Sequence, residues 1–133
     1  MSQSADPDRP TAILAEDDPV ILRVSSIALE RSGFAVTTVT DGAQALQLLE
    51  DTSPDVVILD GMMPNMDGLE TCRPIRGDDR ASRVPGILLS ARSQDTDEEA
   101  ARDAGATAYI RKPFDALTLG ARVRESLNGK APS

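Results

Sequence analysis

Residues 56–60 read Val-Val-Ile-Leu-Asp, a run of four apolar residues that ends in a carboxylate. An uninterrupted apolar run of this length is typical of a central parallel strand, because helices cover both faces of such a strand. In open parallel sheets the ligand site lies beyond the carboxyl ends of the strands. We therefore predict that residues 56–59 form a central strand and that Asp60 lies at the functional edge of the sheet.

The same strand-then-helix pattern recurs five times from Thr11 onward. Further strands are predicted at residues 12–15, 34–39, 87–89 and 108–110. Helices are predicted to open at Asp18 and Asp41 and to cover about residues 68–76, 95–104 and 115–127. This alternation predicts the α/β fold class, with a doubly wound, five-stranded parallel sheet of the form (βα)5.

Several local features can be tested against a structure. In the first helix the apolar residues share one face, and Gly33 stands where a glycine stop is expected. The threonines of strand 34–39 favour an edge position. Pro74 predicts a kink or an early end of the third helix, and Gly86 predicts a weak start of the fourth strand. The apolar residues of that first helical face are Val20, Ile21, Val24, Ile27 and Ala28.

The length of 133 residues suits one domain. We predict a disordered leader at residues 1–10, the folded domain at 11–127 and a flexible tail at 128–133. No apolar run approaches the roughly 20 residues that span a bilayer. The first ten residues also lack the basic and apolar regions of a secretory signal. A cytoplasmic location without membrane contact is therefore expected.

The charge balance and the missing histidine exclude whole classes of function. With 22 acidic and 14 basic residues the net charge is −8, which argues against direct nucleic-acid binding by this domain. The absence of histidine excludes Ser-His-Asp catalysis and histidine-ligated zinc. The single cysteine, Cys72, is interpreted as a packing thiol. Any chemistry must use carboxylates, hydroxyls, lysine and a hard metal ion.

Chemically distinctive residues follow the predicted strands. Glu16, Asp17 and Asp18 follow the first strand, Asp60 ends the third, Ser90 ends the fourth, and Lys112 follows the fifth. Carboxylates that crowd together repel one another unless a cation binds. Oxygen ligands alone favour a hard ion, and Mg²⁺ suits a few carboxylates, carbonyls and waters. An aspartate beside such a metal can act as a nucleophile toward phosphorus.

Taken together, four segments of this chain resemble the receiver domains of response regulators in two-component signalling. The resemblance covers residues 11–127 and implies a flavodoxin-like fold with strand order 2-1-3-4-5. The segments that carry it are Ile13–Pro19, Pro54–Gly68, Ile87–Ala91 and Ala108–Phe114.

The resemblance also implies a role for each site residue. Asp60 would be the phosphoacceptor, Asp17 would bind Mg²⁺ directly, and Glu16 would act on the metal through water. The backbone carbonyl of Met62 would complete the protein ligands, and Lys112 would bind the phosphoryl group. Ser90 and Tyr109 match the switch pair of the family. Asp18 falls one position beyond the acidic pair, and we interpret it as a helix cap.

In function, the resemblance implies a signalling switch rather than an enzyme. A histidine kinase or a histidine phosphotransfer protein would supply the phosphoryl group to Asp60. The modified domain would then present a changed face of the fourth helix, fifth strand and fifth helix to a downstream protein or output domain. Whether phosphorylation drives homodimer formation stays open. Met62 and Arg92, beside the site, lead to the hypothesis of slow self-dephosphorylation.

Three other classes of protein fit less well. A phosphatase of the haloacid-dehalogenase type needs a second aspartate two residues after the nucleophile, and this position is Met62. A receiver-like protein that signals without phosphate commonly lacks an acidic residue or the lysine, and this chain keeps them. A dinucleotide-binding domain needs a glycine-rich fingerprint after its first strand, which is missing here.

Overall fold

Five parallel strands form a single sheet in the order β2-β1-β3-β4-β5, as predicted. The structure is a computed structural model that describes residues 9–61, 68–77, 84–90, 99, 100, 102–111 and 116–129. The order places the apolar strand around Ile58 at the centre and the threonine-containing strand at one edge. The strands are β1 (Thr11–Ala15), β2 (Ala35–Val39), β3 (Val56–Asp60), β4 (Gly86–Ser90) and β5 (Ala108–Arg111).

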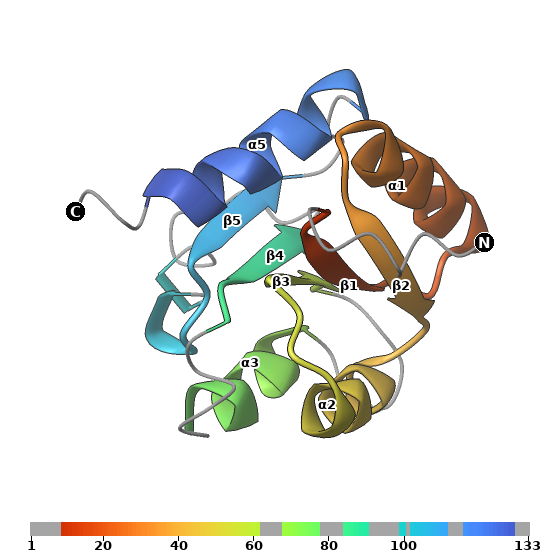
Figure 1. Ribbon diagram of the computed structural model, residues 1–133. Helices are drawn as coiled ribbons and strands as arrows, with labels where there is room; N and C mark the ends of the chain where they lie inside the picture. Colours follow the sequence, from red (N-terminus) through yellow and green to blue (C-terminus); the bar gives the residue numbers. More distant parts are fainter. Residues whose placement is uncertain are drawn as a thin grey trace.

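Helices cover both faces of the sheet. Helices α1 and α5 lie together on one face, while α2 and α3 lie on the opposite face (Figure 1). Residues 99, 100, 102 and 103 are also helical, inside the fourth predicted helix. Among the described residues no helix is both long and apolar enough to cross a membrane. The helix bounds are α1 (Pro19–Arg31), α2 (Gly42–Asp51), α3 (Gly68–Gly77) and α5 (Ala116–Gly129).

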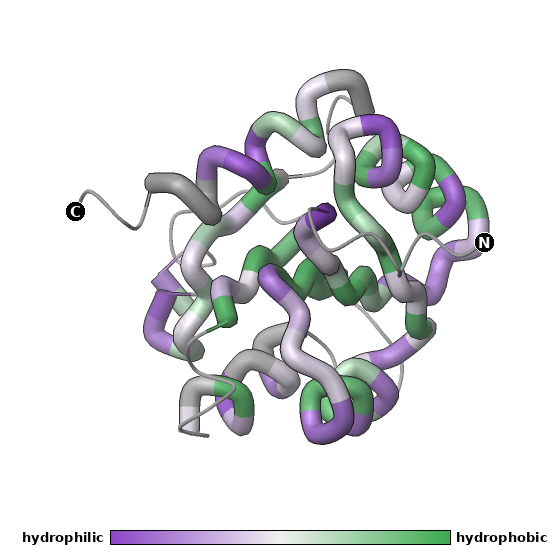
Figure 2. The backbone as a smooth tube through the Cα atoms, in the orientation of Figure 1, coloured by the Kyte–Doolittle hydropathy of each residue, from purple (hydrophilic) through white to green (hydrophobic). Residues whose placement is uncertain are grey.

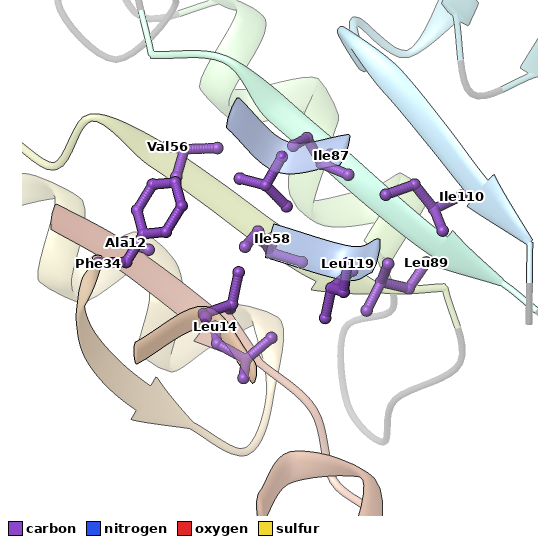
Figure 3. Close-up of a cluster of buried hydrophobic side chains, with 11 residues drawn as sticks. Ala12, Leu14, Phe34, Val56, Ile58, Ile87, Leu89, Ile110 and Leu119 are labelled. Carbon is purple, nitrogen blue, oxygen red and sulfur yellow. The ribbon is translucent and has the colours of Figure 1, made fainter. Parts of the chain in front are cut away.

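The central strands contribute alternate residues to two separate apolar clusters. Side chains of a strand point to opposite faces in turn, so Leu14 and Ile58 face α1 and α5 while Ile13 and Val57 face α2 and α3. Figure 2 shows the hydrophobic strands at the centre of the molecule. Figure 3 shows the cluster beneath α1 and α5, with labelled residues Ala12, Leu14, Phe34, Val56, Ile58, Ile87, Leu89, Ile110 and Leu119.

Of the five apolar residues predicted to share one face of α1, three lie on the surface. Val20, Val24 and Ile27 are 69%, 44% and 40% exposed. The helix instead buries Ser25 and Leu29 completely. The apolar pattern of α1 is wide enough to define two faces, and the sheet contacts the narrower one. The outer apolar residues therefore form a stripe on the surface, defined here as the α1 stripe of Val20, Val24 and Ile27.

Two local irregularities were predicted, one at Pro74 in the third helix and one at Gly86 in the fourth strand. Helix α3 continues through Pro74 to Gly77, so an early end at the proline is not seen. Strand β4 does begin at Gly86, and a Cβ atom built there meets no other atom within 4 Å. Glycine is therefore not required at position 86 by crowding.

The turn between α1 and β2, residues Ser32–Phe34, is held from two sides. Gly33 has φ +99°, a left-handed conformation that suits glycine at a helix end. Arg9 donates to the carbonyl oxygens of Phe34 at 2.7 Å and Gly33 at 3.3 Å. Arg124 of α5 donates through Nε to the Ser32 carbonyl at 2.8 Å. Arg9, which lies in the segment predicted to be a leader, thus contacts the turn that follows α1.

Candidate functional site

The order of the strands brings the predicted acidic residues together at one edge of the sheet. Strand β1 lies beside β3, and Ala15 pairs with Leu59. Glu16 and Asp17 directly follow β1, while Asp60 is the last residue of β3. Because the strands are parallel, their carboxyl ends meet at the same edge. This edge therefore gathers residues that are more than forty positions apart in the sequence.

The three carboxylates form a compact cluster. Glu16, Asp17 and Asp60 each offer an oxygen, and these oxygens all lie within 4.8 Å of one another. Glu16 is 1% exposed and Asp60 is 4% exposed, whereas Asp17 is exposed to solvent. Two of the three acidic groups thus lie below the surface, and the third closes the cluster from the solvent side.

Backbone hydrogen bonds fix both halves of the cluster. The amide of Glu16 donates to the carbonyl oxygen of Val39 at 3.1 Å, which ties the end of β1 to β2. The amide of Gly61 donates to the carbonyl oxygen of Leu89 at 2.6 Å, which ties the residue after Asp60 to β4. Both neighbouring strands therefore hold the segments that carry the carboxylates.

Asp18 is a helix cap, as predicted, and is not part of the cluster. Its Oδ1 atom accepts hydrogen bonds from the amides of Val20 at 2.9 Å and Ile21 at 3.3 Å. An aspartate in this position satisfies amides that have no partner within the helix. The cap fixes the start of α1 immediately after Asp17.

The donor set of the cluster suits a metal ion. Three negatively charged groups this close repel one another, and a bound cation would offset the repulsion. All the donors are oxygens, which suits hard cations such as Mg²⁺ and Ca²⁺ rather than zinc or copper. The residues present therefore fit a hard divalent ion, and one bound here would contact the carboxylate of Asp60.

Of the remaining predicted site residues, the structure describes Ser90 and Tyr109. Ser90 is the last residue of β4 and pairs in the sheet with Arg111, the last residue of β5. Tyr109 lies in β5 beside Leu88. It is half-buried and packs against the apolar cluster that lies between the sheet and helices α2 and α3. The predictions for Met62, Arg92 and Lys112 fall outside the described residues.

The sequence reasoning missed a surface beside the site. The α1 stripe begins at Val20, three residues after Asp17, and the apolar spacing in the sequence did not show that it faces solvent. The spacing of Leu22, Ser25 and Leu29 was the available signal, because it marks a second helical stripe that contains a small residue. A small residue lets a helix approach a sheet closely, and Ser25 is fully buried.

Comparison with known proteins identifies the family. Residues 12–124 match the response regulator receiver domain. The chain therefore belongs to the response regulator receiver domain family, the phosphoacceptor modules of two-component signalling.

Two regulatory proteins are similar in sequence to most of this chain. Transcriptional regulatory protein CseB of Streptomyces coelicolor is 43% identical over 120 residues, which cover 90% of this chain and 50% of the relative. The DNA-binding response regulator MtrA of Mycolicibacterium smegmatis is 37% identical over 119 residues, covering 90% and 51%. The chain thus spans about half the length of these sequence relatives.

A solved structure bears directly on the acidic cluster. The receiver domain of sensor histidine kinase PA1611 from Pseudomonas aeruginosa has a TM-score of 0.82 and 32% identity. The match covers 90% of this chain and 98% of that chain. In that protein a magnesium ion is coordinated in the active site cleft.

Proposed function

We propose that Asp60 is the phosphoacceptor of this receiver domain and that Mg²⁺ is the ion of the acidic cluster. The observation that carries the proposal is the position of Asp60, which ends the central strand within 4.8 Å of the Glu16 and Asp17 oxygens. A carboxylate in a cation site at the ligand-binding edge of a parallel sheet can approach a phosphoryl group as a nucleophile.

The transfer requires one new bond and one broken bond. A carboxylate oxygen of Asp60 would attack the phosphorus of a phosphohistidine, and the phosphorus–nitrogen bond to the imidazole would break. The electron pair of that bond would leave with the imidazole of the donor. A bound Mg²⁺ would supply positive charge for the phosphoryl oxygens. Asp17, Asp60 and the backbone carbonyl of Met62 would hold the ion directly, and Glu16 would act on it through water.

Three residues are proposed to act on the phosphorylated form. Lys112 would neutralise part of the new charge, and Ser90 would donate a hydrogen bond to a phosphoryl oxygen. Tyr109 would turn inward as Ser90 moves. These changes would favour one conformation of the face that includes β5 and α5, on which a downstream protein would dock. The phosphoryl group shifts this balance only by interacting differently with the two conformations.

The α1 stripe is proposed to bind the phosphohistidine-bearing partner. Such a partner must bring its imidazole next to Asp60, so its contact surface must border the acidic edge. The stripe starts beside Asp17 and consists of three large apolar side chains that face solvent. Burying apolar area on a partner stabilises a complex, and within the described part of the chain these three are the large apolar residues that are exposed. The predicted cytoplasmic location stays a prediction.

Intact mass after incubation with acetyl phosphate tests the acceptor. The wild-type chain is expected to gain one phosphoryl mass, about 80 Da, only when Mg²⁺ is present. Asp60→Asn should show no gain, while Asp51→Asn, an exposed aspartate at the end of α2, should behave as wild type. A gain that persists in Asp60→Asn would refute the assignment. No gain in the wild type despite measured Mg²⁺ binding would indicate a domain that signals without phosphate.

A further inference from the structure

Helix α5 lies unusually close to the end of α1. A Cβ atom added to Gly120 would overlap both the Oγ and the Cβ of Ser32, and it would lie 3.5 Å from the carbonyl oxygen of Ala28. Two helices approach this closely only where one of them carries no side chain. Gly120 costs helix stability, about 1 kcal/mol relative to alanine, so its presence in α5 calls for a packing reason. Contact with Ser32 provides that reason.

Arg124 lies one turn further along α5 and reaches the same turn. Its guanidinium donates from Nε and from a terminal nitrogen to the carbonyl oxygen of Ser32. The same group lies over the ring of Phe34, with Cζ 5.1 Å from the ring centroid. Phe34 is fully buried, so the ring is a fixed platform for the cation. Hydrogen bonds and ring contact together hold Arg124 in one place.

The charge of Arg124 also suits its position. The carbonyl of Ser32 follows the last residue of α1, where helix carbonyls lack partners and carry partial negative charge. Arg9 donates to carbonyl oxygens on the same turn. Leu119 and Val123 of α5 are fully buried in the cluster that contains Leu29 of α1. The buried apolar contacts, the close contact of Gly120 and the hydrogen bonds of Arg124 thus all connect α5 with α1 and the turn that follows it.

From these contacts we propose that Gly120 and Arg124 form a clasp that locks α5 to the α1–β2 turn whether or not Asp60 is phosphorylated. The proposal rests on the proposed function and concerns its regulation. The clasp would keep α5 fixed within the face on which a downstream protein is proposed to dock. Any phosphorylation-dependent change in that face is then confined to the chain before α5.

Hydrogen exchange measured by mass spectrometry on the full chain tests the clasp. In the wild type, peptides from residues 119–125 should take up deuterium equally with and without phosphorylation, with the extent of phosphorylation read by intact mass. Arg124→Ala should speed exchange in these peptides about tenfold even without phosphorylation, because a bond to a charged group is lost. It should also make their exchange depend on phosphorylation. Peptides from β3 report whether the fold as a whole is retained.

Matched variants separate the clasp from a general loss of stability. Glu125→Ala changes an exposed neighbour on the same helix and should leave exchange at the wild-type level. Arg124→Lys keeps the charge but loses the planar, two-pronged donor, so an intermediate effect is expected. Gly120→Ala should accelerate exchange in the same peptides without a change of charge.

Two results would overturn the clasp. One is wild-type exchange at residues 119–125 that changes on phosphorylation, and the other is Arg124→Ala exchange equal to that of the wild type. A wild-type chain that gains no phosphoryl mass would refute the proposed function instead. The unphosphorylated comparison of Arg124→Ala with the wild type still decides whether the clasp exists.

Discussion

The backbone amide of Asp18 donates a hydrogen bond to Oε2 of Glu16, over 3.2 Å. One residue thereby links the helix cap and the acidic cluster, since the side chain of Asp18 caps α1 while its amide contacts Glu16. The bond satisfies one oxygen of a carboxylate that is 1% exposed. It also orients Glu16, so the start of α1 and the position of the cluster are set together.

Removing one charge from the cluster should stabilise the fold when no divalent ion is present. Glu16→Gln keeps an oxygen that can accept from Asp18 but relieves repulsion with Asp17 and Asp60. We expect a gain of about 1 to 2 kcal/mol without a divalent ion. Excess MgCl2 should then stabilise the wild type more than the variant. Thermal unfolding with and without the salt measures both effects.

The control for this experiment is Glu50→Gln, which changes an exposed glutamate of α2. It should alter neither the stability nor the response to MgCl2. Equal stabilisation of the wild type and Glu16→Gln by MgCl2 would mean that the ion binds elsewhere.

The α1 stripe should matter for a protein donor and not for a small one. The double variant Val20→Ser and Val24→Ser removes apolar contact area beside Asp17. Phosphotransfer from a histidine phosphotransfer protein that acts on the wild type should slow about tenfold, as for loss of a central interface contact. Labelling by acetyl phosphate should not change. Ala43→Ser, at an exposed position of α2, is the control. An equal loss with both donors would place the defect in the site itself.

The hydroxyl of Ser25 offers a test of the packing of α1. The Oγ atom is buried and makes no hydrogen bond with any described residue. Burying an unpaired hydroxyl costs free energy, so Ser25→Ala should raise the free energy of unfolding by about 1 kcal/mol. Ser26→Ala, at a half-buried neighbouring position, gains the same helix propensity and isolates the effect of burial. Urea unfolding compares the two; an equal gain in both variants would show that burial of Ser25 costs nothing.

The lifetime of the phosphoryl group should depend on Met62. A thioether orients an attacking water poorly, because its sulfur is only a weak acceptor. Asparagine supplies both a donor and an acceptor, so Met62→Asn should lose its phosphoryl group several-fold faster, on the order of a modest general-base effect. The decay of the phosphorylated mass after removal of acetyl phosphate measures the rate. Unchanged decay would contradict the hypothesis of slow self-dephosphorylation.

Much of the fold follows from patterns that are local in the sequence. The apolar run before Asp60 predicts a central strand, and the threonines of residues 37 and 38 predict an edge strand; the sheet order confirms both. The convergence of Glu16, Asp17 and Asp60 was also predictable, because parallel strands align their carboxyl ends. These features depend on the alternation of strands with helices and on the common direction of the strands. A single sequence shows that alternation directly.

Contacts between segments that are distant in the sequence were harder to predict. The buried side of α1 could not be predicted, because apolar periodicity does not rank two apolar faces and the buried face contains a serine. The partners of Arg9 and Arg124 are backbone carbonyls, which any sequence supplies, so no residue pattern points to them. Gly120 was a partial signal, since a glycine inside a helix indicates close packing without naming the neighbour.

The bonds of Arg9 have a practical consequence for where this domain starts. Similarity to the family begins at residue 12, yet Arg9 holds the carbonyls of Gly33 and Phe34, and Pro10 accepts a hydrogen bond from Ala35. A shortened chain that starts at residue 12 would keep all the residues that match the family and still lose the hydrogen bonds of Arg9 and Pro10 to this region. The hydrogen bonds that hold the edge strand therefore begin before the residues that match the family.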